Sequence, residues 1–184
     1  MALRCSSTAR QGGEGNRRLR RLIRVSCVSA ACGVAFAATD AQAADTVRIS
    51  ALSDVSFGTI ANFSTDYLRS QSICVHSKTP PGNYYRVTAV GSGAGGAFLL
   101  NYGSSTLPYE VQWSAAPSQS VGTQLVANQP LTGQQTTSGS GDADDCSKGP
   151  ATTASLIVVV RSASVAAATS GTYSGTLSLV IGPE

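Results

Sequence analysis

The chain has 184 residues, a formal net charge of +3 and only 12% charged residues, with 19 glycines and a single histidine. Apolar segments recur along its whole length, which excludes an intrinsically disordered composition. We expect an amino-terminal leader before residues 44–184. Residues 44–184 have the size of one domain, which would bury roughly two-thirds of the surface that its unfolded chain exposes.

Residues 1–43 have the layout of a secretory signal peptide. Seven arginines lie in residues 1–24, the apolar stretch VSCVSAACGVAFAA follows, and Ala41-Gln42-Ala43 has the small-x-small form of a cleavage site. The apolar stretch is shorter than the roughly 20 residues that span a bilayer, so a transmembrane anchor is the weaker alternative. Cys27 and Cys32 leave a lipoprotein signal open, without a good lipobox, and the arginine pairs leave twin-arginine export open. We predict export to the periplasm and on to the cell surface or the medium.

Cleavage after Ala43 would change the charge of the protein. The remaining chain would hold six basic and eight acidic residues, a formal charge of −2. The basic balance of the full chain therefore belongs to the leader and gives no argument for nucleic-acid binding.

Two of the five cysteines, Cys74 and Cys146, lie outside the leader. In an exported protein, two cysteines most simply form one disulfide bond, with two free thiols as the alternative. The bond would close a long loop, for which the chain-entropy model assigns about 4 kcal/mol of stability.

Short alternating or apolar segments, separated by Gly, Pro, Ser and Asn, predict an all-β sandwich of about seven or eight strands, with no convincing amphipathic helix. In chain order, the predicted strands lie in residues 45–60, 71–77, 83–90, 97–102, 107–113, at most briefly in 123–127, and in 153–163 and 172–181. Residues 127–150 are rich in Gly, Ser and Gln and predict a long exposed loop.

Three of these segments carry the clearest patterns. Residues 107–113 alternate strictly, with Leu107, Tyr109, Val111 and Trp113 on one face. Residues 156–160 are apolar on both faces, which predicts a central strand. The last segment places one set of apolar residues on a single face, and as the final strand it is a candidate for a sheet edge. That set is Tyr173, Leu177, Leu179 and Ile181.

No constellation of residues predicts catalysis, a metal site or a cofactor. His76 is the only histidine, and it lies on a predicted strand beside Cys74. The only acidic cluster, Asp142, Asp144 and Asp145, supplies oxygen ligands of the kind that calcium takes, but at no recognised spacing. Most aromatic residues are in phase with aliphatic ones, so we expect them in the core rather than on a sugar-binding surface.

The order of the motifs resembles the spore coat protein U domain, which is shared by subunits of archaic chaperone–usher pili. The matching pieces are VSFGTI, the cysteine strand SICV, the strand pair YRVTAVGSGAGGAFLLNYG, LPYEV and the terminal SGTYSGTLSLVI, over most of residues 52–181. The chain departs from the family in three places. It has no cysteine just before Phe57-Gly58, and it has Gly175 where the family often has Asp. For the amino-terminal extension of alternating apolar residues that family pilins tend to carry, it has only residues 44 to about 52.

The resemblance implies an immunoglobulin-like, pilin-type sandwich that lacks one strand. A periplasmic chaperone would first fill the gap, and the amino-terminal strand of a neighbouring subunit would replace it at an outer-membrane usher. By analogy, Val47, Ile49 and Ala51 of TVRISAL would form the donor strand, and the segment from Tyr173 to Ile181 would border the acceptor groove. The alternative is that TVRISAL is the first strand of this domain itself.

The expected function is therefore that of an exported structural subunit of a surface pilus or coat, acting in assembly and cell adhesion rather than in catalysis. The alternative is a stand-alone secreted module, with a complete sandwich, that binds a glycan or another surface ligand.

Overall fold

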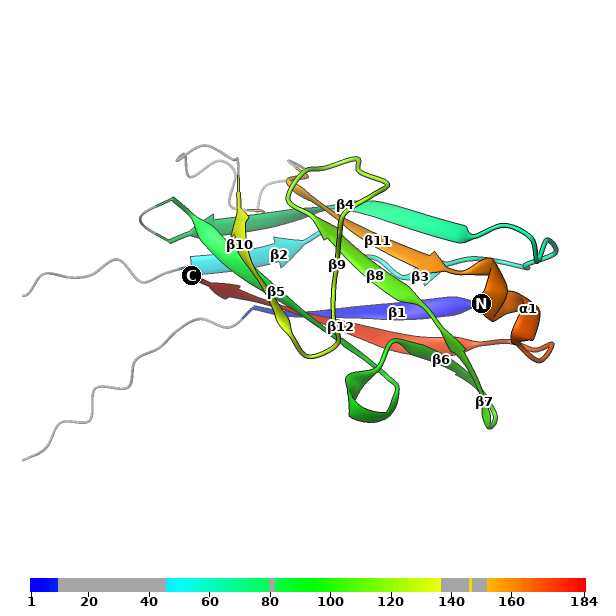
Figure 1. Ribbon diagram of the computed structural model, residues 1–184. Helices are drawn as coiled ribbons and strands as arrows, with labels where there is room; N and C mark the ends of the chain where they lie inside the picture. Colours follow the sequence, from blue (N-terminus) through cyan, green and yellow to red (C-terminus); the bar gives the residue numbers. More distant parts are fainter. Residues whose placement is uncertain (10–45, 80–81, 137–145, 147–151) are drawn as a thin grey trace, which may run out of the picture.

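The protein is an all-β sandwich of two sheets (Figure 1). The computed structural model describes residues 1–9, 46–79, 82–136, 146 and 152–184. The larger sheet has seven strands: β1 (Ala2–Ala9), β3 (Val55–Ser56), β5 (Tyr84–Gly91), β6 (Leu99–Tyr102), β7 (Ser105–Pro108), β10 (Pro130–Gln135) and β12 (Ser174–Pro183). The smaller sheet has five: β2 (Thr46–Ser50), β4 (Tyr67–Lys78), β8 (Glu110–Ser114), β9 (Thr123–Gln124) and β11 (Ala154–Val160).

The strand order explains how each sheet is built. The larger sheet runs β10-β5-β12-β1-β3, with β6 paired to β12 and to β7. The smaller sheet runs β2-β4-β11-β8-β9. Two short helices complete the described chain, the 3-10 turn η1 (Ala94–Gly96) and the helix α1 (Ser162–Ala167).

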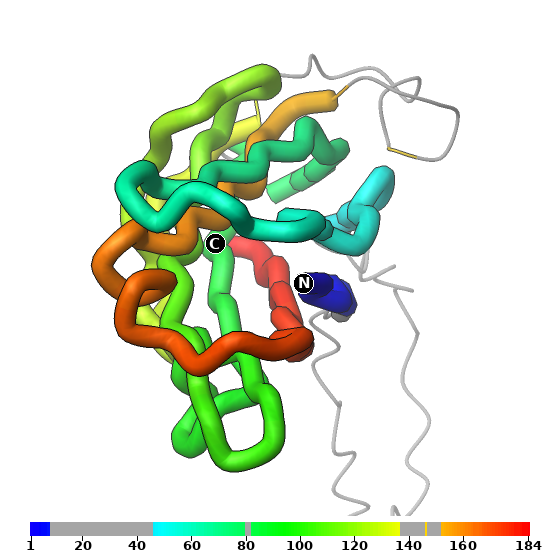
Figure 2. The backbone as a smooth tube through the Cα atoms, turned by 90° about the vertical axis from the view of Figure 1, so that its right-hand side faces the viewer, coloured from blue at the N-terminus to red at the C-terminus, as the bar shows by residue number. Residues whose placement is uncertain are grey.

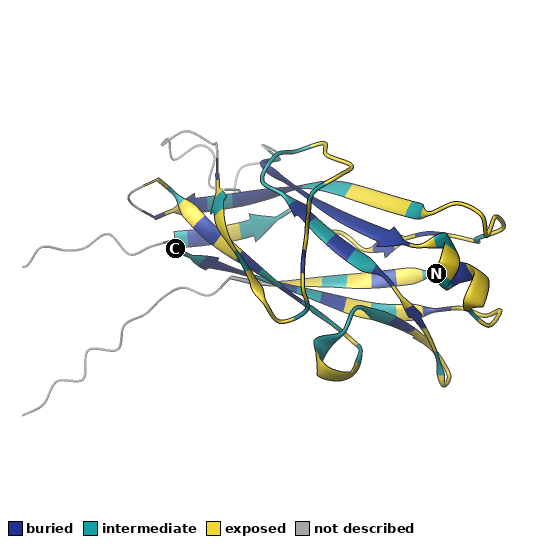
Figure 3. Cartoon of the chain, viewed as in Figure 1, coloured by how far each residue is buried: buried dark blue, intermediate teal, exposed yellow. Residues whose placement is uncertain are grey.

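Buried residues of both sheets form one core cluster, and Figure 3 colours these parts of the strands dark blue. Tyr85 of the larger sheet and Trp113 of the smaller sheet are each 1% exposed and pack edge to face, with ring centroids 6.3 Å apart. The indole N–H of Trp113 donates a hydrogen bond to the Tyr85 hydroxyl at 3.3 Å. This bond lets two large polar-tipped rings remain buried without an unpaired group.

β11 is the central strand that the sequence predicts. All seven of its residues are buried, and it pairs with β4 on one side and with β8 on the other. Its one polar side chain, Ser155, is fully buried but satisfied, because its hydroxyl accepts from Gln119 N and donates to the Ala116 carbonyl. A buried hydroxyl needs such partners to avoid a desolvation cost.

The segment predicted as one strand over residues 107–113 is divided between the sheets. β7 pairs with β6 in the larger sheet, and β8 pairs with β11 in the smaller sheet. Tyr109 lies at the crossing and belongs to neither strand. The alternation is correct on both sides of the break, because Leu107, Tyr109, Val111 and Trp113 are all buried. A strand that changes sheet keeps its inward face, so periodicity alone does not reveal the crossing.

Other differences from the predicted strands are local. Residues 130–135, predicted as part of an exposed loop, form β10 and pair with β5. A helix of six residues, α1, follows β11. The described chain has twelve strands rather than seven or eight. Two predicted segments each divide into two strands, β2 with β3 and β7 with β8, and β1 and β10 lie outside the predicted strands.

The predicted disulfide bond is confirmed. Cys74 of β4 and Cys146 are joined, with their Cα atoms 5.7 Å apart and a separation of 72 positions in sequence. The Ser50 hydroxyl of β2 also donates to the Cys146 carbonyl at 3.1 Å. The bond therefore fastens residue 146 to the pair of strands at the edge of the smaller sheet.

α1 is held at the surface by an ion-pair group that we call the Arg161 group. The Arg161 guanidinium binds Asp66 at 2.8 Å and Glu110 at 2.5 Å. Asp66 also accepts a hydrogen bond from Ser162 N, at the first turn of the helix. No helix in the described part of the chain is both long and apolar enough to cross a membrane.

Candidate functional site

The most unusual feature of the fold is the position of β1. This strand lies between β12 and β3 in the larger sheet, a position that we call the β1 site. It runs parallel to β12 over eight residue pairs, from Ala2 opposite Ser174 to Ala9 opposite Ile181. It also pairs antiparallel with β3 at two positions. Figure 2 shows the first and last strands of the chain side by side, with β1 in blue and β12 in red.

β1 joins two strands that have no direct ladder with each other. Among the described strands, β1 is the only ladder partner of β3 and the only ladder partner of β12 on that side, because β5 and β6 pair with the opposite side of β12. Backbone hydrogen bonds continue the pairing at its amino-terminal end. Ala2 N donates to the Tyr173 carbonyl at 3.3 Å, and Phe57 N donates to the Met1 carbonyl at 3.2 Å.

One side of β1 faces the core of the sandwich. Leu3 is 1% exposed and belongs to the main core cluster, and Met1 and Cys5 are partly buried against that cluster. Ala2, Arg4 and Ser6, between them, are exposed. This period of two is what a half-buried strand requires. Complete burial of one leucine side chain contributes about 1.5–3 kcal/mol.

The fit of β1 weakens along its length. Among the β1 side chains whose burial is described, those of residues 2–7, Leu3 is the one large side chain that is fully buried, and Ser7 is exposed. Its polar contacts are peripheral: Cys5 N donates to the Asp54 carboxylate at 3.3 Å, and Ser6 shares a hydroxyl hydrogen bond with Ser178 at 2.9 Å. The β1 site therefore receives less apolar surface at Ser7 than at Leu3.

Cys5 and Tyr109 form the least satisfied part of this site. Burial, with a smaller contribution from the Asp54 charge, raises the pKa of the Cys5 thiol to about 11, so this free thiol stays protonated at neutral pH. Burial also raises the pKa of Tyr109, and the nearby Cys5 adds to the shift. The Tyr109 hydroxyl is buried and has no hydrogen-bond partner among the described residues.

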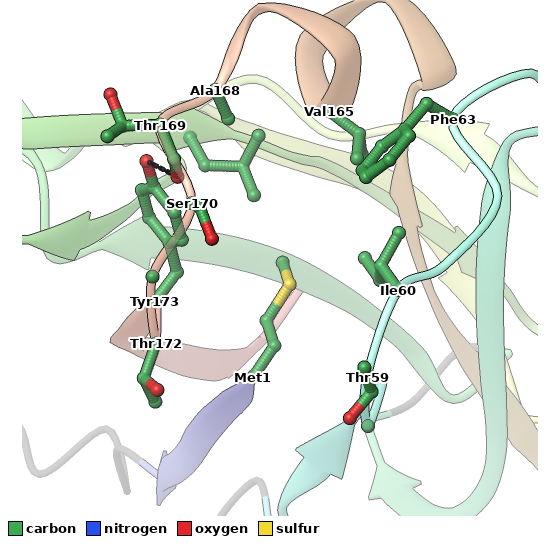
Figure 4. Close-up of a pocket in the computed structure, with 13 residues that line it drawn as sticks. Met1, Thr59, Ile60, Phe63, Val165, Ala168, Thr169, Ser170, Thr172 and Tyr173 are labelled. Atoms are coloured by element: carbon green, nitrogen blue, oxygen red, sulfur yellow. Dashed lines mark hydrogen bonds between the residues drawn. The ribbon is translucent and has the colours of Figure 1, made fainter.

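A cavity of about 490 Å³ lies at the amino-terminal end of β1. Figure 4 shows the Met1 side chain between two walls, one formed by residues 59–63 and the other by residues 168–173. Ile60, Phe63 and Val165 supply apolar surface, and Phe63 is 55% exposed. The Tyr173 hydroxyl, which donates to the Thr169 carbonyl at 2.9 Å, fixes the second wall.

The residues predicted to border a groove lie directly beside β1. Tyr173 is 4% exposed, and Leu177, Leu179 and Ile181 are each fully buried. β12 is not an edge strand in this structure, because β5 pairs with it on one side and β1 on the other. Its role as an acceptor of a foreign strand stays a prediction.

The residues predicted as a donor strand lie elsewhere. Val47 and Ile49 are on β2, which pairs antiparallel with β4 of the same chain over five residues. Val47 is 1% exposed, and Ile49 packs against the core. Ala51 is exposed and has a φ of 63°, where the chain leaves β2 to reach β3 in the other sheet. The structure thus places this segment as a strand of its own domain, as in the alternative interpretation of the sequence.

Sequence reasoning missed the part that residues 1–9 play in the fold. The arginines and the apolar stretch that follow them indicate a leader, and the only strand signal is the spacing of Met1, Leu3 and Cys5. The described residues contain no cluster of three or more potential metal ligands, and the acidic residues Asp142, Asp144 and Asp145 lie outside them.

Comparison with known proteins adds no relative: no family model, no curated protein and no solved structure matches the chain. The fold and the site define the class of the protein in physical terms. It is a two-sheet sandwich in which the amino-terminal strand of the chain, β1, lies between β12 and β3 of the larger sheet.

Proposed function

We propose that this protein is an exported structural subunit of a surface pilus or coat, whose sandwich is completed by a β-strand from another polypeptide. The observation that carries the proposal is the placement of β1 between β12 and β3. β1 belongs to residues 1–43, which the sequence predicts to be removed on export. Removal of that leader would take one strand out of the middle of a sheet.

Such a removal would leave a gap in the larger sheet that favours the binding of a replacement strand. The main-chain groups of β12 and β3 that pair with β1 would lose their partners, and core residues beneath Leu3 would meet water. Unpaired strand edges with apolar flanks bind extended segments of other chains. A subunit of this kind becomes stable by assembly, which suits a component of a polymer.

The proposal also explains the divided course of residues 46–56. β2 pairs with β4 in the smaller sheet, and β3 pairs with β1 in the larger sheet. The first segment of the mature domain would therefore contribute one strand to each sheet. An immunoglobulin-like, pilin-type sandwich with one strand missing beside its last strand is the arrangement that we propose for residues 44–184. A periplasmic chaperone, an outer-membrane usher and neighbouring subunits are its proposed partners, at the periplasm and the cell surface.

The alternative of a stand-alone glycan-binding module receives less support. Such a module needs aromatic rings at its surface, but Tyr85, Tyr109, Trp113 and Tyr173 are all buried. Tyr84 and Tyr102, which are 40% and 45% exposed, lie on the separate strands β5 and β6. We propose no catalytic role.

The first experiment determines the amino terminus and the state of assembly of the exported protein. Intact mass and native mass measurements on protein from the cell envelope should give a chain that begins at Ala44 and is bound to another polypeptide or polymerised. A monomer of residues 44–184 that stays folded and unassociated would contradict the proposal and favour the stand-alone module.

A further inference from the structure

We propose that the cavity at the amino-terminal end of β1 binds one small uncharged molecule that has an aromatic body and a hydroxyl group, the chemistry of a phenol. This binding site goes beyond the proposed function and does not depend on it. Of the described residues that line the cavity, only Met1 lies in the expected leader, and all the others lie within residues 58–173. The walls of the cavity therefore belong to the domain itself.

The size and the apolar surface of the cavity suit a small aromatic molecule. Its volume of about 490 Å³ lies within the range of roughly 300–1,000 Å³ that small-molecule sites occupy. Leu107 and Val165 line it as buried core residues, whereas Phe63, beside Val165 in Figure 4, is 55% exposed. An aromatic ring placed against Phe63 would remove apolar surface of both rings from water.

The charge of the lining excludes an ionised ligand. None of the described lining residues has a charged side chain, and the α-amino group of Met1 would leave with the leader. A charged group that enters an apolar cavity loses its hydration, and no side chain of opposite charge would compensate for that loss here. The molecule that fits this lining is therefore uncharged.

The need for a hydroxyl group follows from Ser170. Figure 4 shows the Ser170 hydroxyl on the inner side of the second wall, residues 168–173, where it points towards Met1. Within the described part of the chain, this hydroxyl has no hydrogen-bond partner. A serine hydroxyl both donates and accepts, so it would pair with a ligand hydroxyl in either direction.

Both walls of the cavity are held in place before any ligand binds. The Tyr67 hydroxyl accepts a hydrogen bond from Asn62 N at 3.1 Å and donates one to the Asn62 carbonyl at 2.8 Å, which fixes the first wall, residues 59–63. Asp66 accepts from Ser162 N at 2.8 Å and thereby ties the loop of the first wall to α1. A cavity that is already formed spares the ligand the cost of ordering its walls.

The test measures three probes that share one ring system, by titration calorimetry. The probes are 2-naphthol, naphthalene, which lacks the hydroxyl, and 2-naphthoate, which carries a charge. The protein is the full chain, expressed without export and acetylated at its amino terminus, so that Met1 has no charge. The variants are Phe63→Ala and Ser170→Ala. The control is Tyr84→Ala, because Tyr84 is another exposed aromatic residue and lies outside the cavity, on β5.

The three probes and the three variants should give a distinct pattern. 2-Naphthol should bind to the wild type at least about tenfold more tightly than 2-naphthoate. Phe63→Ala should weaken the binding of 2-naphthol and of naphthalene by about tenfold each. Ser170→Ala should weaken 2-naphthol by about threefold to tenfold and leave naphthalene unchanged. Tyr84→Ala should change neither. Phe63 and Ser170 are exposed, so we expect both variants to keep the thermal midpoint of the wild type.

Each part of the proposal has a result that would overturn it. If no probe binds at its limit of solubility, or if Phe63→Ala binds 2-naphthol as tightly as the wild type, the cavity is not the site. Binding of 2-naphthoate as tight as that of 2-naphthol would overturn the uncharged class of ligand. An equal loss of naphthalene and 2-naphthol in Ser170→Ala would overturn the role of the hydroxyl. None of these results bears on assembly, which the mass measurements on the exported protein test separately.

Discussion

At the scale of single residues, the clearest electrostatic feature is the position of Asp66. The hydrogen bond from Ser162 N, followed by the bond from Arg161, lowers the pKa of this carboxyl below its usual value of 3.8. A carboxyl whose pKa is lower in the folded state than in the unfolded chain stabilises the fold above the unfolded pKa. That contribution is lost as the pH falls through the folded pKa.

We therefore expect Asp66→Asn to destabilise the protein most at neutral pH. Its difference in free energy of unfolding from the wild type should shrink as the pH falls from 5 to 3, because the wild-type carboxyl then becomes protonated as well. Urea denaturation at pH 7, 5 and 3 measures the difference. Glu110→Gln is the control, since it leaves the Asp66 bond to Ser162 intact. An Asp66→Asn difference that is constant with pH would show that the charge has no role.

The disulfide bond is the second prediction at this scale. Replacing both Cys74 and Cys146 by Ser releases a loop of 72 residues in the unfolded chain and should lower the free energy of unfolding by about 4 kcal/mol. Denaturation under non-reducing conditions checks this value, with Cys5→Ser as the matched control, because Cys5 is a free thiol. Equal stability of the double variant and the wild type would mean that the bond does not constrain the unfolded chain.

At the scale of elements, two neighbouring residues of β1 test whether this strand is part of the folded sheet. Leu3 is 1% exposed, and Arg4 is exposed on the other side of the strand. In the chain that retains its leader, Leu3→Ala should cost about 2–5 kcal/mol. Arg4→Ala should cost less than about 0.5 kcal/mol. Thermal and urea denaturation of the two variants measure the contrast, and equal small effects would show that β1 is not integral to the folded chain.

The elements also show what the sequence could and could not predict. β11 and β12 were predictable, because an entirely apolar run and a strict alternation each have one interpretation in a sandwich. β1 was not, because the arginines after it indicate a leader and local patterns say nothing about a partner strand more than 160 residues away. The break at Tyr109 was not predictable either, since both halves keep the same inward face.

Gly175 lies at a crowded position of β12. A Cβ atom at this position would come within 3.0 Å of the Leu100 side chain and of the Leu99 carbonyl. β12 also places Gly175 directly beside Leu3 of β1. A larger residue here would require these neighbours to shift, so the packing favours glycine.

At the scale of the whole molecule, the two ends of the chain complete one sheet. The sandwich, the buried face of β12 and the disulfide bond agree with the sequence-based expectations for residues 44–184. The β1 site changes how the last strand is understood. It is a central strand while residues 1–9 are present, and it becomes an edge if the leader is removed.

The most direct test measures the thermal stability of residues 44–184, separated from any bound polypeptide and refolded, with and without a peptide of residues 1–9. A ligand that binds only the folded state stabilises it by about 2.7 kcal/mol at one hundred times its Kd. We expect the unfolding midpoint to rise by on the order of 10 °C as the peptide is added. A midpoint that is already equal to that of the full chain, and that does not change with the peptide, would contradict the claim that the domain lacks a strand.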